Sequence, residues 1–318
     1  MSIPTRINLS TSEDVLTAVP YLLGFHPTNS LVFVCLRDGN VSVTGRIDLH
    51  AGKPPADRGV RTLVDRLAAD GVTAVILIGY GTPTAVTVMT DAFLDACRAL
   101  HLAVREALRV TDDRYWSYLC PGGDCCPIDG TPLPETADAI AAGFVATGHI
   151  ALPSREDLAS ALDPIDDLDT VTTLIAAIRL APESCAQVEA LLQRYASDVG
   201  DFPDIAETAL ILTWLHLDEA VLRAALAHID LNPPVPQVEL WIWLTRHAPP
   251  QYLAEPASVL AYTAWRAGNG ALARIACERA LAAVPEHRLA RLVIEFLNAG
   301  ANPTGVPPLA SFGTDTAT

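Results

Sequence analysis

The side chains best suited to chemistry gather in one stretch, Arg114-Tyr-Trp-Ser-Tyr-Leu-Cys120-Pro-Gly-Gly-Asp-Cys125-Cys126-Pro127. Three aromatic residues lead into a loop that holds three of the seven cysteines of the chain. Thiols at such short spacing could bind a metal ion, form a disulfide or act as nucleophiles. We favour a structural thiol cluster at a domain junction, because free cysteine is among the most buried residue types.

A metal site in this loop would lack a ligand. Structural zinc is held by four side chains, usually in spaced pairs, whereas the loop offers the three thiols of Cys120, Cys125 and Cys126. Two of these are adjacent, so they point apart in an extended chain, and the next histidine along the chain, His149, belongs to a separate expected element. We therefore expect no metal and no other cofactor. Metal binding by the three thiols and a redox-active disulfide remain the alternatives.

A second group of polar residues comes from distant parts of the chain. Its members, as candidate ligand-binding residues, are His26, Arg46, Asp48, Tyr80, Gly81, Asp112 and Arg114. A histidine near an aspartate could act as a general base, and paired arginines could hold a carboxylate or a phosphate. The simpler interpretation is that His26 shapes a turn with Pro27, and that Arg46 and Asp48 form a surface ion pair.

Composition excludes several classes of partner. The net charge of the 318 residues is −16, Lys53 is the only lysine, and no basic cluster is present, so nucleic acid is an unsuitable partner. Apolar runs are too short to span a bilayer, and the N-terminus does not read as a signal peptide. We expect a cytoplasmic protein with reduced thiols and no membrane contact. The scarcity of lysine indicates a bacterium with GC-rich codons.

The elements that must position these residues divide at about residue 134. Residues 1–133 alternate β-branched runs with amphipathic stretches, which predicts an α/β domain with a mixed, three-layer sheet of about five strands. The expected strands are Leu31–Leu36, Val41–Leu49, Thr73–Ile78, Ala103–Val110 and Tyr115–Leu119, and the expected helices are Asp57–Ala69 and Thr84–Leu100. Ser10 and Glu13 have the spacing of a capping box for a first helix, which Pro20 and Gly24 should end.

Strand direction separates the two polar groups. Right-handed crossovers make the second, third and fourth strands point the same way, and the first and fifth point the opposite way. His26, Asp48, Tyr80, Asp112 and Arg114 then fall at one edge of the sheet, where the carboxyl ends of parallel strands tend to bind ligands. The cysteine loop leaves the fifth strand at the other edge, roughly 17 to 20 Å away.

Residues 134–300 predict an all-helical domain with two helix pairs, at 203–230 and 254–285. The second pair resembles a tetratricopeptide repeat, with Leu260, Ala261, Ala264, Ala273 and Ala280 at the packing positions and Gly268-Asn269-Gly270 in the turn. A helix from Glu286 to Leu297 should cap the stack. Residues 301–318 have little to bury and predict a disordered tail.

Several motifs resemble an actinobacterial family known as a domain of unknown function. They are Pro20-Tyr-Leu-Leu-Gly-Phe-His-Pro27 with Ser30-Leu31-Val32, Gly45-Arg46-Ile47-Asp48, Arg114-Tyr-Trp-Ser-Tyr118, Cys125-Cys126-Pro127 and the segment Ala264 to Ala273. The resemblance covers most of residues 5–300. It implies a taxonomic group and a domain organisation, and it carries no activity or catalytic residue.

Two functions remain open from the sequence. The first is a ligand-binding, protein-binding or scaffold protein whose helical domain contacts a protein or peptide partner, which the lack of catalytic motifs favours. The second is an enzyme, a hydrolase or transferase, that acts on a small anionic molecule at the sheet edge. In that enzyme His26 would be the base, and Arg46 or Arg114 would hold the anion.

Overall fold

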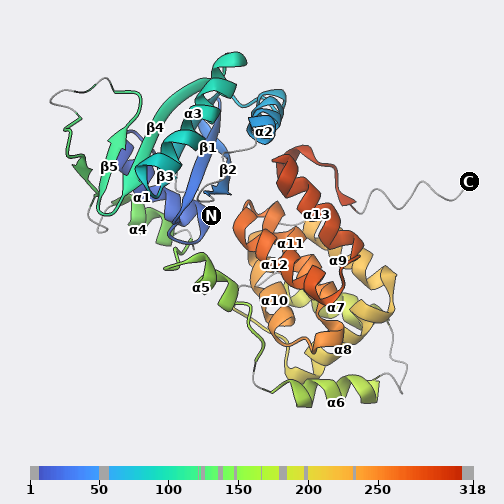
Figure 1. The fold of residues 1–318 in the computed structure, drawn as a ribbon. Helices are drawn as coiled ribbons and strands as arrows, with labels where there is room; N and C mark the ends of the chain where they lie inside the picture. Colours follow the sequence, from blue (N-terminus) through green and yellow to red (C-terminus); the bar gives the residue numbers. More distant parts are fainter. Residues whose placement is uncertain are drawn as a thin grey trace, which may run out of the picture. The chain divides into compact units, whose positions relative to one another are not determined.

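The structure is a computed structural model that describes residues 7–49, 57–120, 122, 126–134, 139–146, 149–165, 167–178, 185–196, 200–231 and 234–309. The chain divides into two compact units, Met1–Leu158 and Ala159–Thr318. The first carries the sheet and the second is helical (Figure 1), so an α/β domain followed by an all-α domain is confirmed. The division follows Leu158 rather than residue 133, because α4 (Ala139–Ala146) packs against α1 (Ser12–Leu23) of the first unit.

The first unit holds a six-stranded sheet in the order β2-β1-β3-β4-β5-β6. Its strands are β1 (Ser30–Arg37), β2 (Asn40–Asp48), β3 (Ala74–Tyr80), β4 (Ala103–Thr111), β5 (Arg114–Ser117) and β6 (Thr131–Pro132). β2 and β3 each pair antiparallel with β1, and β3 pairs parallel with β4, so β2, β3 and β4 point the same way as expected. The β1–β2 turn uses the left-handed region at Asp38 and Gly39, which suits a two-residue hairpin loop.

Helices cover both faces of this sheet. α2 (Asp57–Ala69) and α3 (Pro83–Ala99) pack on one face (Figure 1). There Leu31, Phe33 and Leu77 share a buried cluster with Phe93. The residues of β1 and β3 that point to the opposite face are buried as well. Ala107 of β4 belongs to the cluster under α2 and α3, so the neighbouring Glu106 points to the opposite face. Ser12 of α1 donates to Glu106, which places α1 on that opposite face. This is the three-layer arrangement that the apolar strands predict.

Two details at the ends of this unit differ from the expectation. The capping box of α1 is formed by Thr11 and Asp14, one residue beyond Ser10 and Glu13, and the helix continues through Pro20 to a left-handed Gly24. Both pairs have the same spacing, so only the backbone geometry distinguishes them.

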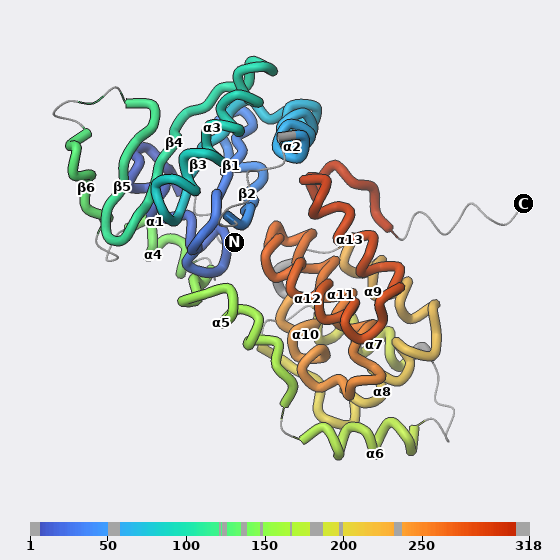
Figure 2. The backbone as a smooth tube through the Cα atoms, in the orientation of Figure 1, coloured from blue at the N-terminus to red at the C-terminus, as the bar shows by residue number. Residues whose placement is uncertain are grey.

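The short strand β6 has no periodic signal of its own, and it forms because the chain returns beside β5 after the cysteine loop (Figure 2).

The described part of the second unit is helical. Its helices are α6 (Leu168–Ile178), α7 (Cys185–Tyr195), α8 (Ile205–Leu217), α9 (Glu219–Leu231), α10 (Pro234–Arg246), α11 (Ala254–Arg266), α12 (Gly270–Ala283) and α13 (Arg288–Ala299), and α5 (Arg155–Ser160) crosses the division between the units. The five positions expected to pack in the α11–α12 pair are buried, and Asn269 caps α12 after a left-handed Gly268. Arg288, Arg291 and Glu295 are exposed on α13, as suits a helix that closes a stack.

α11 is enclosed by its neighbours. Every residue from Pro256 to Trp265 is buried, and α8, α9, α10, α12 and α13 all contact this helix. In a tetratricopeptide array the corresponding helix lines an open groove, but here it has no open face for a peptide. A partner protein on the helical unit remains a prediction, and it would have to contact the outer helices.

Part of the segment that we expected to be a disordered tail is held against α11. Ala301 to Leu309 include the short helix η2 (Pro303–Gly305). Trp265 Nε1 donates to the Ala301 carbonyl at 3.3 Å, and Arg266 Nη1 donates to Pro303 and Val306 at 2.5 and 3.2 Å. Residues 310–318 lie outside the described residues.

We expect the helical unit to lose stability on mild acidification. Burial lowers the pKa of His228, His247 and His287 below the ordinary 6.5, because it disfavours the charged imidazolium. As the pH falls below about 6.5, the unfolded chain binds protons that the folded chain does not, so the free energy of unfolding decreases. Urea midpoints followed by tryptophan fluorescence should therefore be lower at about pH 5.5 than at about pH 7.5.

The substitution His247→Gln should reduce this dependence on pH, and His26→Gln, at an exposed histidine of the first unit, should leave it unchanged. If wild type and His247→Gln show the same change of urea midpoint with pH, His247 does not contribute to the pH dependence of the free energy of unfolding.

Candidate functional site

The backbone brings the predicted edge residues to one end of the sheet. Ser30, at the start of β1, pairs with Asp48 of β2 and with Tyr80 of β3. Tyr80 pairs with Val110, and the following turn leads to Arg114. The positions therefore share an edge, as strand direction predicts, but their side chains take separate partners.

The guanidinium of Arg46 contacts residues close to it at the same end of the sheet. Its Nη2 lies 2.6 Å from Asp48 Oδ1 and donates to the Thr28 carbonyl at 3.3 Å, and its guanidinium lies over the Phe25 ring. The Asp48 side chain is 59% exposed, so this is the surface ion pair of the simpler interpretation. Such a pair stabilises a fold by about 0 to 1 kcal/mol.

His26 is not held as a catalytic base would be. Its side chain is exposed, and its backbone N–H donates to the Leu152 carbonyl at 2.9 Å. Across the described ranges, no ion pair or hydrogen bond joins its imidazole to Asp48 or Arg114. Asp112 is an exposed turn residue in the left-handed region. The edge therefore does not present a base and a carboxylate together.

The turn after β3 uses its polar groups internally. Gly81 N–H donates to the Val110 carbonyl at 3.1 Å, and the Gly81 carbonyl accepts from Thr111 Oγ1 at 2.8 Å. Burial raises the pKa of the Tyr80 hydroxyl, which has no hydrogen-bond partner among the described residues. The N–H and carbonyl groups of Gly81 are therefore both used within the fold.

Arg114 points to the return of the cysteine loop. Its Nη1 donates to the Gly130 carbonyl at 2.7 Å and to the Asp129 carbonyl at 3.3 Å. These bonds fix the chain just before β6, and they engage the guanidinium that was expected to hold an anion. Arg114 thus holds the chain beside a different site, the cavity under the cysteine loop.

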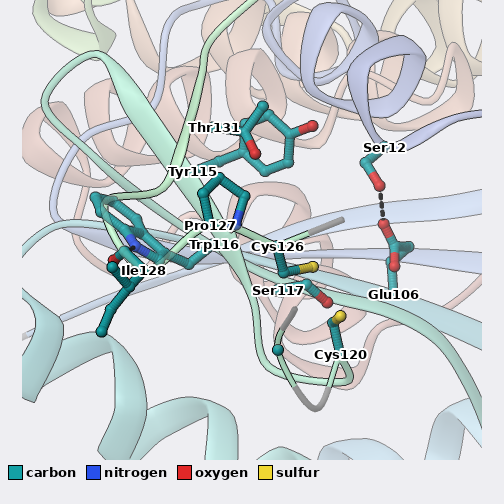
Figure 3. Close-up of a pocket in the computed structure, with 11 residues that line it drawn as sticks. Ser12, Glu106, Tyr115, Trp116, Ser117, Cys120, Cys126, Pro127, Ile128 and Thr131 are labelled. Atoms are coloured by element: carbon teal, nitrogen blue, oxygen red, sulfur yellow. Dashed lines mark hydrogen bonds between the residues drawn. The ribbon is translucent and has the colours of Figure 1, made fainter. Parts of the chain in front are cut away.

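That cavity has a volume of about 410 Å³ and opens beside β5 and β6 (Figure 3). Its lining residues are Ser12, Glu106, Tyr115, Trp116, Ser117, Cys120, Gly122, Cys126, Pro127, Ile128 and Thr131. Cys120 and Cys126 are half-buried there, and Cys125 lies outside the described residues. We name this site the cysteine-loop cavity.

Trp116 forms one wall of the cysteine-loop cavity. Its indole N–H donates to the Ile128 carbonyl at 3.1 Å, and Arg109 lies over the ring at 4.0 Å from the centroid. Gly130 lies against the indole in the left-handed region, where a Cβ would stand 2.5 Å from Trp116 Cε2. Only glycine fits this turn, so the ring and the returning chain determine each other's position.

The opposite wall is polar. Ser12 Oγ, at the start of α1, donates to Glu106 Oε2 of β4 (Figure 3). Tyr115 Oη donates to Glu13 Oε1 at 3.5 Å, and burial together with the charge of Glu13 raises the pKa of this phenol. The carboxylate of Glu106 makes this side of the cavity an acceptor of hydrogen bonds.

Sequence reasoning identified the cysteine loop but not the residues that face it. Glu106 sits in the middle of a strand and Ser12 inside the first turn of a helix, so neither belongs to a motif. Strand parity could have indicated Glu106, since it is a charged residue on a face that is otherwise buried. Among the described residues, no group of three histidine, cysteine or acidic side chains could hold a metal ion.

The fold and the site define a two-unit protein, a mixed α/β unit with a loop cavity and a unit of packed helices. The chain belongs to the family described as Domain of unknown function (DUF4192), whose model matches residues 13–304. The resemblance to an uncharacterised family is thus confirmed. No curated protein and no solved structure matches the chain. Within the part that the structure describes, no helix is long and apolar enough to cross a membrane.

Proposed function

We propose that this protein binds a small molecule in the cysteine-loop cavity. The observation that carries the proposal is the lining of this cavity, with the aromatic Trp116 and Tyr115 and the polar Glu106 and Thr131 around one space. Sites for small molecules commonly measure about 300 to 1,000 Å³, with aromatic walls and a few convergent polar groups. The volume of about 410 Å³ fits a ligand of one or two rings.

The lining also indicates which ligands fit. A flat ring can stack on the exposed part of Trp116, and a hydrogen-bond donor can reach the Glu106 carboxylate. Because Glu106 is acidic, an anion would be repelled from this wall. We therefore propose a neutral or cationic ring compound with at least one N–H or O–H donor.

The contacts at the first sheet edge count against the alternative of an enzyme with His26 as base. Arg46 is paired with Asp48, and Arg114 is bonded to two loop carbonyls. A clamp for an anion would have to break these contacts before it could bind. The cysteine-loop cavity needs no such rearrangement to admit a ligand.

A fragment screen by protein-observed NMR tests the proposal. The indole N–H of Trp116 gives a separate signal, which the variant Trp116→Phe assigns among the five tryptophans. Under reducing conditions, aromatic fragments with a donor should shift this signal, and Glu106→Gln should weaken binding about tenfold, as expected for loss of a charge-assisted hydrogen bond.

A blocking variant and a matched control locate the binding. Thr131→Phe fills the cavity and should abolish the shifts, whereas Thr172→Phe, on the exposed side of α6, should leave them unchanged. The proposal fails if fragments bind Thr131→Phe as well as wild type, or if no fragment moves the Trp116 signal.

A further inference from the structure

Two cysteines reach the cysteine-loop cavity from opposite ends of one loop. Cys120 follows β5, Cys126 precedes the return to β6, and both side chains are half-buried. Figure 3 shows both sulfur atoms in the same part of the cavity as the Ser117 hydroxyl, away from the pair of Ser12 and Glu106. A small thiol-reactive molecule that enters the cavity meets both thiols.

The chain on each side of the two cysteines is tied to the same strand. Before Cys120, the Leu119 N–H donates to Ser117 Oγ at 3.2 Å. After Cys126, the Ile128 carbonyl accepts from the Trp116 indole at 3.1 Å. Both ends of the loop that carries the two thiols are therefore fixed to β5.

The other fully described cysteines are in a different state. Cys35, Cys97 and Cys277 are completely buried, and burial raises their pKa values to about 12, 11 and 12. A thiol reacts as its thiolate, so these three groups are protected by both enclosure and protonation. The contrast leaves Cys120 and Cys126 as the accessible pair among the cysteines whose side chains are described.

We propose that Cys120 and Cys126 form a reversible disulfide by exchange with a small-molecule disulfide. The thiolate of one cysteine attacks the small disulfide, which gives a mixed disulfide and releases one small thiolate. The second cysteine then attacks the cysteine sulfur of the mixed disulfide and releases the other thiolate. The two protons of the cysteines pass to the two released thiolates, so two cysteine thiols are oxidised and one small disulfide is reduced to two thiols.

The disulfide would join two points of the cavity wall and restrict the loop. The bond closes a ring of only the residues from 120 to 126, so it changes the cavity rather than the fold. This inference goes beyond the proposed ligand, because exchange needs only access to the thiols. The exchange experiment contains no cavity ligand and the fragment screen is run in the reduced state, so failure of one leaves the other standing.

Mass spectrometry on the whole protein after treatment with cystamine, a small disulfide that carries two ammonium groups, tests this proposal. Trypsin releases residues 115–155 as one peptide that carries Cys120, Cys125 and Cys126. We expect this peptide to become lighter by two hydrogen atoms, and to recover its mass with dithiothreitol. The variant Cys125→Ser should form the disulfide to the wild-type extent, whereas Cys120→Ser and Cys126→Ser should form it at least tenfold less.

Other products would overturn the proposal. It fails if Cys126→Ser forms the bond as readily as wild type, which would make Cys125 the partner, or if only mixed disulfides with cysteamine accumulate. If a variant does not fold, fragmentation of the oxidised wild-type peptide assigns the bond directly. Cys35→Ser serves as the control at a buried site, and it should leave the oxidation unchanged.

Discussion

The variant Arg266→Ala is expected to lower the free energy of unfolding of the helical unit by about 3 to 5 kcal/mol. The Asp230 side chain is 1% exposed, and its Oδ1 accepts from Arg266 Nε and Nη2 at 3.0 and 2.6 Å. The Tyr262 hydroxyl also donates to this oxygen, at 2.5 Å. Removal of the arginine leaves a buried carboxylate with one donor, and an uncompensated buried charge is costly.

Guanidinium unfolding followed by tryptophan fluorescence measures this effect, because four of the five tryptophans lie in the helical unit: Trp214, Trp241, Trp243 and Trp265. Arg291→Ala, in α13 of the same unit, is the matched control. Arg291 forms an ion pair with Glu286 in which both side chains are more than half exposed, so the expected loss is below about 1 kcal/mol. The double variant Arg266→Ala with Asp230→Asn should recover part of the loss.

Equal losses for Arg266→Ala and Arg291→Ala would contradict the importance of burial at the Arg266–Asp230 pair. The tail provides a second readout. Arg266 also donates to the Pro303 and Val306 carbonyls, so hydrogen exchange in residues 301–309 should become faster in Arg266→Ala.

The variant Gly79→Ala is expected to destabilise the α/β unit by about 1 to 3 kcal/mol, as overpacking of a dense core does. Gly79 lies in the central strand β3, where α3 crosses closely above it. A Cβ at this position would stand 2.1 Å from Cγ1 of Val86, and Val86 is fully buried. The strand and the helix would have to separate, which also loosens the neighbouring core.

Hydrogen exchange in peptides of β3 and α3 measures this change within the α/β unit. The double variant Gly79→Ala with Val86→Ala should be less destabilised than the sum of the single variants, because the smaller side chain makes room for the new methyl group. Gly305→Ala, in the helical unit, is the control for the glycine-to-alanine change itself. A Cβ there would meet no atom within 4 Å, so hydrogen exchange in its own segment should stay unchanged. Strict additivity of the two substitutions would refute a direct clash.

The two variants also separate the proposed site from the fold. Both substituted residues lie outside the lining of the cysteine-loop cavity. Arg266→Ala should leave fragment binding and disulfide formation unchanged, because it acts in the helical unit. Gly79→Ala acts in the unit that holds the cavity, so a loss of binding in this variant would reflect the packing of the sheet.

Local patterns were sufficient to predict most of the first unit. The hairpin turn at Asp38 and Gly39 follows from residues that accept the left-handed region, and α2 begins and ends at Asp57 and Ala69 as its periodicity indicates. Strand directions follow from the connections, and β2, β3 and β4 point the same way in the structure. The same reasoning could not choose between the two capping boxes, because their spacing is equal.

The sequence by itself determined the two kinds of domain, the succession of strands and helices along the first domain, and the presence of an unusual thiol loop. Only the tertiary structure decided that Arg114 bonds the loop carbonyls, that α11 is enclosed, and that Glu106 faces the thiols across a cavity. Secondary structure follows from periodicity over neighbouring residues, which a single sequence displays. The partner of a guanidinium or a thiol depends on which distant segments fold beside it, and side-chain type alone does not specify that.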